Sequence, residues 1–250
     1  MPIRSLLLMC AATMLLASMS PSTARADPDE KWQVNIRPYV WIAGMDGTFS
    51  GSGLPQVHVN TSFSDVLEHF DKGALVVLEA QRGKQGVYVD IMHIRLSDSG
   101  VVPPGVPARA RTTTTSSLLA GQYEISSSEA YDLHALAGIR YWSLDLDAAV
   151  SFPPAAGGPV DISKSTSWVD PQFGVKGTFR VNPRLKLDGA IIVAPTSKAS
   201  WDLSTNLAYS VSDHTDLILG YRYMTINRDK PSFKVDSSLQ GPVIGLDFRF

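Results

Sequence analysis

Hydrophobic and polar residues alternate with a period of two over long stretches of this chain. In residues 167–181, Phe173 and Val175 lie on the apolar face of the pattern, while Asp170 and Gln172 lie on the other. Residues 32–42 and 201–211 alternate in the same way. A period of two predicts β-strands, and these runs exceed the roughly 5–6 residues of an average globular strand.

The last ten residues form the clearest of these patterns. One face is bulky and apolar and the other is glycine or charged; the apolar residues are Ile244, Leu246, Phe248 and Phe250, and the others Gly245, Asp247 and Arg249. An outer-membrane barrel strand has such faces, because one meets lipid and the other a polar lumen. An edge strand of a soluble sandwich is the alternative for this segment taken alone.

Turn signals divide the chain into about ten strands. Tight turns are predicted at 82–86, 125–129, 182–184 and 212–214, and longer connections at 98–108, 148–164, 195–199 and 227–235. The predicted strands are 32–43, 73–82, 86–97, 109–124, 129–147, 166–181, 185–194, 200–211, 216–226 and 239–250. Eight strands result if one pair is misread, and twelve if 48–50 and 57–61 pair as a further hairpin. The expected fold is all-β, an antiparallel transmembrane β-barrel with short periplasmic turns and longer outer connections.

The beginning of the chain predicts export. Arg4 precedes an apolar run at 6–16, and Ala24-Arg25-Ala26 resembles a signal-peptidase site. We therefore expect a signal peptide at 1–26 and one barrel domain at 27–250. Because Cys10 lies in the expected signal and is the single cysteine, we expect no disulfide and no cysteine metal site in the mature protein.

One segment, 62–70, has a helical period instead. Its apolar residues recur at i, i+3, i+4 and i+7, namely Phe63, Val66, Leu67 and Phe70. Ser62 or Ser64 is a candidate cap, with Asp65 in the first turn. The helix is either a plug over the lumen or a packing helix in a long loop. The strand parity places it on the outer side, and a further hairpin would move it to the periplasmic side.

Several short motifs together resemble those of a group of uncharacterised proteobacterial outer-membrane β-barrels, distantly similar to opacity proteins. The motifs are residues 39–41, 62–65, Glu79, 168–171, 220–223 and 241–245. The resemblance covers most of the expected mature chain and implies an integral outer-membrane location, but no activity. The periplasmic position of both termini is expected from the strand parity, because placing the tight turns in the periplasm makes the last strand end there. The ending also resembles the signal read by the outer-membrane assembly machinery, which would involve Leu246, Phe248 and Phe250. Outer-membrane lipid and that machinery are the expected partners.

Charged residues on the expected inner face have both signs. The candidate lumen charge cluster is Arg37, Glu79, Asp90, Arg140, Asp170, Lys176, Arg222 and Asp247. Charges inside a narrow barrel must pair, because an isolated buried charge is very costly. A largely closed polar lumen with a structural or surface-interaction role is therefore the expectation, and a narrow pore for small ions or solutes is the alternative.

Other classes of function find little support. A net charge of −2 does not indicate nucleic-acid binding. A lipid-modifying enzyme is a second alternative, but no Gly-x-Ser-x-Gly elbow and no closely spaced histidine pair occurs in the sequence. We expect no enzymatic activity, no metal and no cofactor.

Overall fold

The computed structural model describes residues 31–51, 54–102, 106–151, 158–196, 198–230 and 233–250, and the expected signal peptide lies outside them. The strands are β1 Gln33–Trp41, β2 Gly44–Gly51, β3 Leu54–Thr61, β4 Phe70–Arg82, β5 Gln85–Val102, β6 Val106–Ser127, β7 Tyr131–Ser151, β8 Pro159–Asn182, β9 Leu185–Ala194, β10 Ser200–Ser212, β11 Thr215–Lys230 and β12 Phe233–Arg249. The helix α2 spans Phe63–Glu68.

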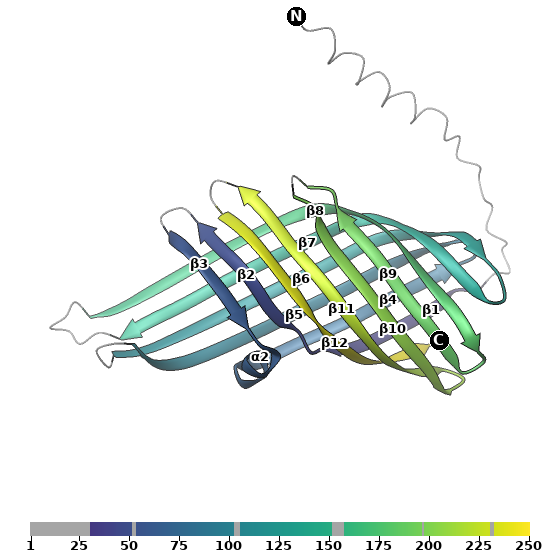
Figure 1. Cartoon of the computed structure of the whole chain (residues 1–250), viewed down its shortest axis with the longest axis horizontal. Helices are drawn as coiled ribbons and strands as arrows, with labels where there is room; N and C mark the ends of the chain where they lie inside the picture. The colour runs from purple at the N-terminus through teal and green to yellow at the C-terminus, as the bar shows by residue number, and fades with distance from the viewer. Residues whose placement is uncertain (1–30, 52–53, 103–105, 152–157, 197, 231–232) are drawn as a thin grey trace, which may run out of the picture. The chain divides into compact units, whose positions relative to one another are not determined.

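Among the described residues, ten antiparallel strands, β1 and β4 to β12, close into a barrel through pairing of β12 with β1 (Figure 1). The hairpin β2–β3 adds to the same edge of β12, beyond the end of β1. Both the predicted ten-stranded barrel and the further hairpin at 48–50 and 57–61 are therefore present. We call the end that holds residues 33 and 249 the terminal end, and the opposite end the hairpin end.

The tight turns were predicted correctly and all lie at the terminal end. They join β4 to β5, β6 to β7, β8 to β9 and β10 to β11. The first has Gly83 at a φ of 57°, a left-handed conformation that glycine adopts without a steric penalty.

Prolines mark the places where strand pairing changes. Pro38 is in the last pair between β1 and β4, and Pro171 lies just beyond the last pair between β8 and β9, Phe173 with Val193. Pro242 lies where the partner of β12 changes from β1 to β2. Because proline lacks an N–H group, it is tolerated where a ladder ends.

An apolar belt covers the outer wall. Its exposed side chains include Val40, Leu119, Ile139, Phe173, Ile191, Leu207, Leu219, Ile244 and Leu246. Exposed aromatic residues border it, with Tyr131 and Tyr209 towards the terminal end and Tyr141, Trp201 and Tyr221 towards the hairpin end. The stretch from Tyr131 to Tyr141 matches the roughly 9–11 residues that a tilted strand needs to cross a bilayer. This belt confirms the predicted strand phases.

Strands β5 to β8 continue well beyond the belt, which corrects the predicted long connections. The segments 98–102 and 106–108, expected in a loop, are paired strand, and so are 148–151 and 159–164. The connection at 227–235 is likewise mostly strand, whereas 195–199 is a connection as predicted. Proline and glycine in these segments suggested loops, but Pro107 and Pro159 lie near the starts of β6 and β8, where proline is tolerated, and they pair in register with Val101 and Ser151.

Helix α2 confirms the helical segment, although it is shorter than 62–70. Ser62 caps it: its backbone N–H donates to Asp65 Oδ2 at 2.9 Å, and the N–H of Asp65 donates back to Ser62 Oγ at 3.3 Å. The added hairpin does not move the helix to the other side, because β2 continues in the direction of β1 and β3 returns only part of the way. Backbone bonding of His69 to Ser97 places the end of α2 in the hairpin-end half.

Candidate functional site

A network of buried polar side chains crosses the lumen at the level of the belt. Its members come from five strands around the wall: Tyr39 on β1, Asp90 on β5, Arg140 on β7, Asp202 on β10 and Arg222 on β11. Inward alternation on each strand brings these positions to the barrel axis. Three of the candidate lumen charges, Asp90, Arg140 and Arg222, are among them.

Arg222 is the centre of this network. Its guanidinium donates to Asp90 at 2.6 Å, to both carboxylate oxygens of Asp202 at 2.9 and 2.7 Å, and to the hydroxyl of Tyr39 at 2.8 Å. Arg140 donates to the same Asp202 at 2.5 Å, and Tyr39 donates to Asp90 at 2.9 Å. Two arginines thus face two carboxylates, so the charge is balanced within the network.

An apolar and aromatic layer lies inside the barrel on the hairpin-end side of this network. Trp142 and Trp168 stack with ring centroids 5.9 Å apart. The network arginines also lie against this layer, Arg222 at 5.2 Å from the ring centroid of Trp41 and Arg140 at 5.8 Å from that of Trp142. The remaining buried members are Tyr39, Val77, Met92, Met224, Ile226, Val235 and Val243.

A polar cavity of about 200 Å³ lies on the other side of the network, towards the terminal end. Glu79 and Lys176 form an ion pair across it, as two of the predicted lumen charges. The cavity is also lined by His134, whose Nε2 atom is buried without a hydrogen-bond partner among the described residues. These groups can bind water, ions or a small polar molecule.

Arg37 connects the closing strands to the far wall. It donates to Asp247 on β12 at 2.7 Å and to Asp188 on β9 at 3.3 Å. Since β1 and β12 are the pair that closes the barrel, this contact reinforces the closure. The sequence predicted Arg37 and Asp247 as lumen residues. It also predicted Asp170, but this carboxylate accepts the indole N–H of Trp168 at 2.8 Å instead of pairing with an arginine.

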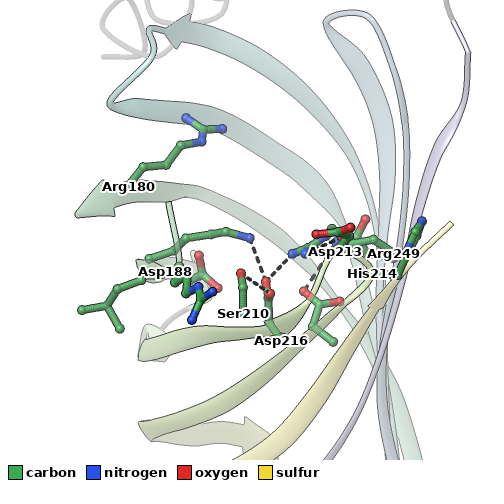
Figure 2. Close-up of polar contacts among 12 residues, drawn as sticks. Arg180, Asp188, Ser210, Asp213, His214, Asp216 and Arg249 are labelled. Carbon is green, nitrogen blue, oxygen red and sulfur yellow. Dashed lines mark hydrogen bonds and ion pairs between the residues drawn. The ribbon is translucent and has the colours of Figure 1, made fainter. Parts of the chain in front are cut away.

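Another buried carboxylate, that of Asp216, connects several strands at the terminal end (Figure 2). It accepts hydrogen bonds from Ser210 at 2.6 Å and Lys186 at 2.7 Å, and it pairs with Arg249. Arg249 also donates to the backbone carbonyl of Asp213 at 2.9 Å. The contacts join β9, β10, β11 and β12, and so they fix the end of the last strand.

Sequence reasoning missed Asp202 and Asp216, the two carboxylates that receive the most contacts. The alternation placed Asp202 on the polar face of 201–211, but no local signal separated it from the other inward residues. Asp216 begins a predicted strand beside a turn, where a charged residue is ordinarily solvated. Only the assembled barrel brings the partner cations of both residues close.

The predicted plug residues lie in α2 and at the start of β4, in the segment that connects β3 to β4. Asp65 is exposed in the α2 cap, and Phe70 is 46 % exposed. The side chains of Phe63 and Leu67 are outside what the structure describes. Hydrogen bonds from Ser62 lower the pKa of Asp65. Blocking of the lumen by α2 stays a prediction.

His69, directly after α2, is the one histidine with a raised pKa among the described residues. Its Nδ1 atom contacts the backbone carbonyl of Asp65 at 2.7 Å, and its Nε2 atom lies 3.4 Å from Asp98. The backbone contact, followed by the carboxylate, raises the pKa of His69 because both favour the charged ring.

No group of three or more His, Cys, Asp or Glu side chains within the described ranges is arranged to hold a metal ion. Nor does the described part of the chain contain a helix long and apolar enough to span a membrane.

Comparison with known proteins supports the fold. No protein-family model matches the chain, and no curated protein matches it in sequence. Among solved structures, the outer membrane protease OmpT of Escherichia coli is similar, with a TM-score of 0.59, 10% identity, and coverage of 89% of this chain and 98% of OmpT.

Two further solved structures have lower TM-scores. The translocator domain of the autotransporter NalP from Neisseria meningitidis has a TM-score of 0.45 at 11% identity, covering 97% of each chain. Ail of Yersinia pestis, in complex with the heparin analogue sucrose octasulfate, has a TM-score of 0.38 at 14% identity, covering 88% of this chain and 99% of Ail. The likeness to OmpT shows the fold: this chain is a closed antiparallel β-barrel of the outer-membrane type.

Proposed function

We propose that this protein is an integral outer-membrane barrel with a sealed lumen, which acts through its hairpin end as a structural or surface-interaction protein. The observation that carries the proposal is the buried contact of Arg222 with Asp90 and Asp202 across the lumen. Ions would have to break these contacts and displace the stacked tryptophans to pass. Because a sealed lumen transports nothing, the functional region of the protein is its surface.

The strand lengths support a role for the hairpin end. β8 has 24 residues and β6 has 22, whereas a tilted strand crosses a bilayer with about 9–11. Beyond Tyr141, the outward residues of β7 become Ser143, Asp145 and Asp147, which suit water and not lipid. The extension of β5 to β8 therefore presents a paired, rigid surface outside the membrane.

Conductance in planar bilayers tests the seal. The wild-type protein should give no steady channels, whereas Trp142→Ala with Trp168→Ala should admit ions if the aromatic layer is the barrier. Trp201→Ala, on the lipid-facing side, is the matched control and should behave like wild type. Large steady conductance from the unchanged protein would refute the seal and support a narrow pore instead, for which the 200 Å³ polar cavity is the favouring feature.

The proposed orientation places both termini in the periplasm. It predicts that Ser163→Cys, beyond the belt on β8, reacts with a membrane-impermeant maleimide on intact cells. Arg184→Cys, in a tight turn, should react only after the outer membrane is permeabilised. The opposite labelling pattern would reverse the orientation.

We also propose that the barrel is not an enzyme. OmpT is a protease, and the pair His69 and Asp98 is the arrangement here that could activate a water molecule. However, His69 is partly exposed and Asp98 is exposed, and neither lines the lumen cavity. Peptide hydrolysis by the wild-type protein that disappears in His69→Ala would contradict this proposal.

A further inference from the structure

A group of basic residues gathers on the outer wall just beyond the apolar belt. We call it the basic patch: Lys72 on β4, His93 and Arg95 on β5, and Arg109 and Arg111 on β6. All five positions alternate with inward residues and so point away from the lumen. Lys72 on β4 is the register partner of Arg95 on β5. Arg111 on β6 is paired with Ser97, two residues after Arg95, and is therefore a diagonal neighbour of Arg95 on the same face. The side chains thus share one area of the surface.

The height of the basic patch matches lipid headgroups. Tyr141 on β7 and Trp201 on β10 both lie at the hairpin-end edge of the belt, although Trp201 pairs through Val193 and Phe173 with Ala137, four residues before Tyr141. Positions of equal height therefore shift along the paired rows from strand to strand, as strand tilt requires. The row of Tyr141 reaches β5 at Ile91, and this shift moves the edge of the belt on β5 to about His93, so Arg95 lies only a few ångströms beyond it. Headgroups occupy the several ångströms beyond the hydrocarbon core.

The cations of the basic patch are available for a ligand. Among the described residues, none of Lys72, Arg109 and Arg111 forms an ion pair, and Arg95 donates only to Thr113 at 3.4 Å. Asp147, the register partner of Arg111 on β7, accepts a hydrogen bond from Ser163, and Asp71 accepts one from Ser97.

Acidic residues adjoin the patch at β7, where Asp147 is the register partner of Arg111. Asp145, Asp147 and Asp161 lie on β7 and β8, and the first two accept hydrogen bonds from serine hydroxyls. They would repel an anion and confine it to β4–β6.

We propose that the basic patch binds the phosphate-bearing headgroup of a membrane lipid, with the acyl chains against the belt below. Arginine forms bidentate hydrogen bonds to phosphate, so the patch suits the headgroup. The apolar belt lies next to the patch on the membrane side, so it suits the acyl chains of the same lipid. In the proposed orientation this lipid lies in the outer leaflet. The binding itself does not depend on the sealed lumen.

Binding of diphosphoryl lipid A to the detergent-purified protein, followed by native mass spectrometry, tests the proposal. Wild type should bind diphosphoryl lipid A more tightly than the monophosphoryl form. Arg95→Gln with Arg111→Gln should weaken binding by at least about tenfold, since charge-assisted hydrogen bonds are lost. The single variant Lys72→Gln should weaken it in the same direction, and Asp145→Asn should not weaken it.

Inorganic phosphate distinguishes the source of the ligand. It should not displace lipid A at equal concentration, because it cannot contact the belt. Effective displacement would point to a soluble phosphate compound and overturn a lipid site. Equal lipid binding by wild type and the double arginine variant, with both shown to be folded by heat-modifiable migration, would also overturn it. None of these substitutions changes a residue inside the lumen. A negative result for lipid binding would therefore not affect the conductance test of the sealed lumen.

Discussion

At the scale of single residues, Arg222 is the buried charge whose substitution should lower the free energy of unfolding most. It is 7 % exposed and contacts two carboxylates and a tyrosine hydroxyl. In such a setting the cost of substitution comes mainly from the charges left behind, not from the lost attraction. The same reasoning applies to Asp202, which serves two arginines.

Arg222→Ala should therefore lower the free energy of unfolding by about 3–5 kcal/mol, the range for breaking one side of a buried ion pair. Lys234→Ala removes a partner of Asp229 at an exposed site and should cost no more than about 1 kcal/mol. Urea unfolding in detergent or lipid compares the two. Similar costs for both variants would mean that the lumen network is solvated and not buried.

His69 should titrate above its ordinary range. Because the pKa of His69 is raised in the folded protein, the stability from the contact between the charged ring and Asp98 is fully present below about pH 6.5, the ordinary histidine pKa. This stability is lost as the pH rises through the raised pKa of the folded protein. NMR titration of the His69 ring in micelles measures this. Asp98→Asn should bring the pKa down, whereas Asp229→Asn, a distant exposed carboxylate, should leave it unchanged; an identical response to both would argue against the contact.

At the scale of elements, each strand has an outer face set by lipid and an inner face set by its partners. β10 illustrates this, because Leu207 is exposed in the belt while Ser204 lines the polar cavity. The two positions are three residues apart and therefore on opposite faces of one strand. They offer a direct comparison of the two environments.

Leu207→Lys should cost about 2–4 kcal/mol if the position is near the bilayer midplane, since lysine cannot be solvated there. Ser204→Lys should cost less, because the side chain enters a polar cavity beside Asp202 and Asp188. Reversible unfolding in lipid vesicles gives both values. A larger cost at Ser204 would show that space in the lumen, and not lipid contact, limits substitution on β10.

At the scale of the whole molecule, closure depends on the last strand. β12 pairs with β11 along its length, with β1 at the terminal end and with β2 at the hairpin end. The N–H of Phe250 donates to the carbonyl of Val34 at 2.9 Å, and its side chain is 75 % exposed. An exposed terminal aromatic contributes little to packing, which suits a residue recognised during assembly.

Phe250→Ala should therefore lower the yield of folded barrel in cells far more than it lowers the stability of barrel that has formed. The readouts are heat-modifiable migration for yield and urea unfolding for stability. Pro195→Ala, in a connection at the hairpin end, is the control and should leave the yield unchanged. Equal yields would remove Phe250 from the assembly signal.

The sequence by itself determined the strands, their inward and outward faces, the tight turns and the apolar last strand, because each depends on residues close together in the chain. The period of two fixes a face wherever one side meets lipid. It also identified Arg37, Glu79, Asp90, Arg140 and Arg222 as inward charges, since inward direction follows from phase alone.

Only the tertiary structure decided which of these charges meet. Asp202 lies on β10, far along the chain from Asp90 and Tyr39, and the closed barrel places all three around Arg222. Likewise, the proline and glycine content of 98–108 and 148–164 indicated loops, but backbone pairing with neighbouring strands keeps much of both segments extended. Phase is a local property, whereas partners across a lumen depend on strand number, stagger and closure, which no short segment encodes.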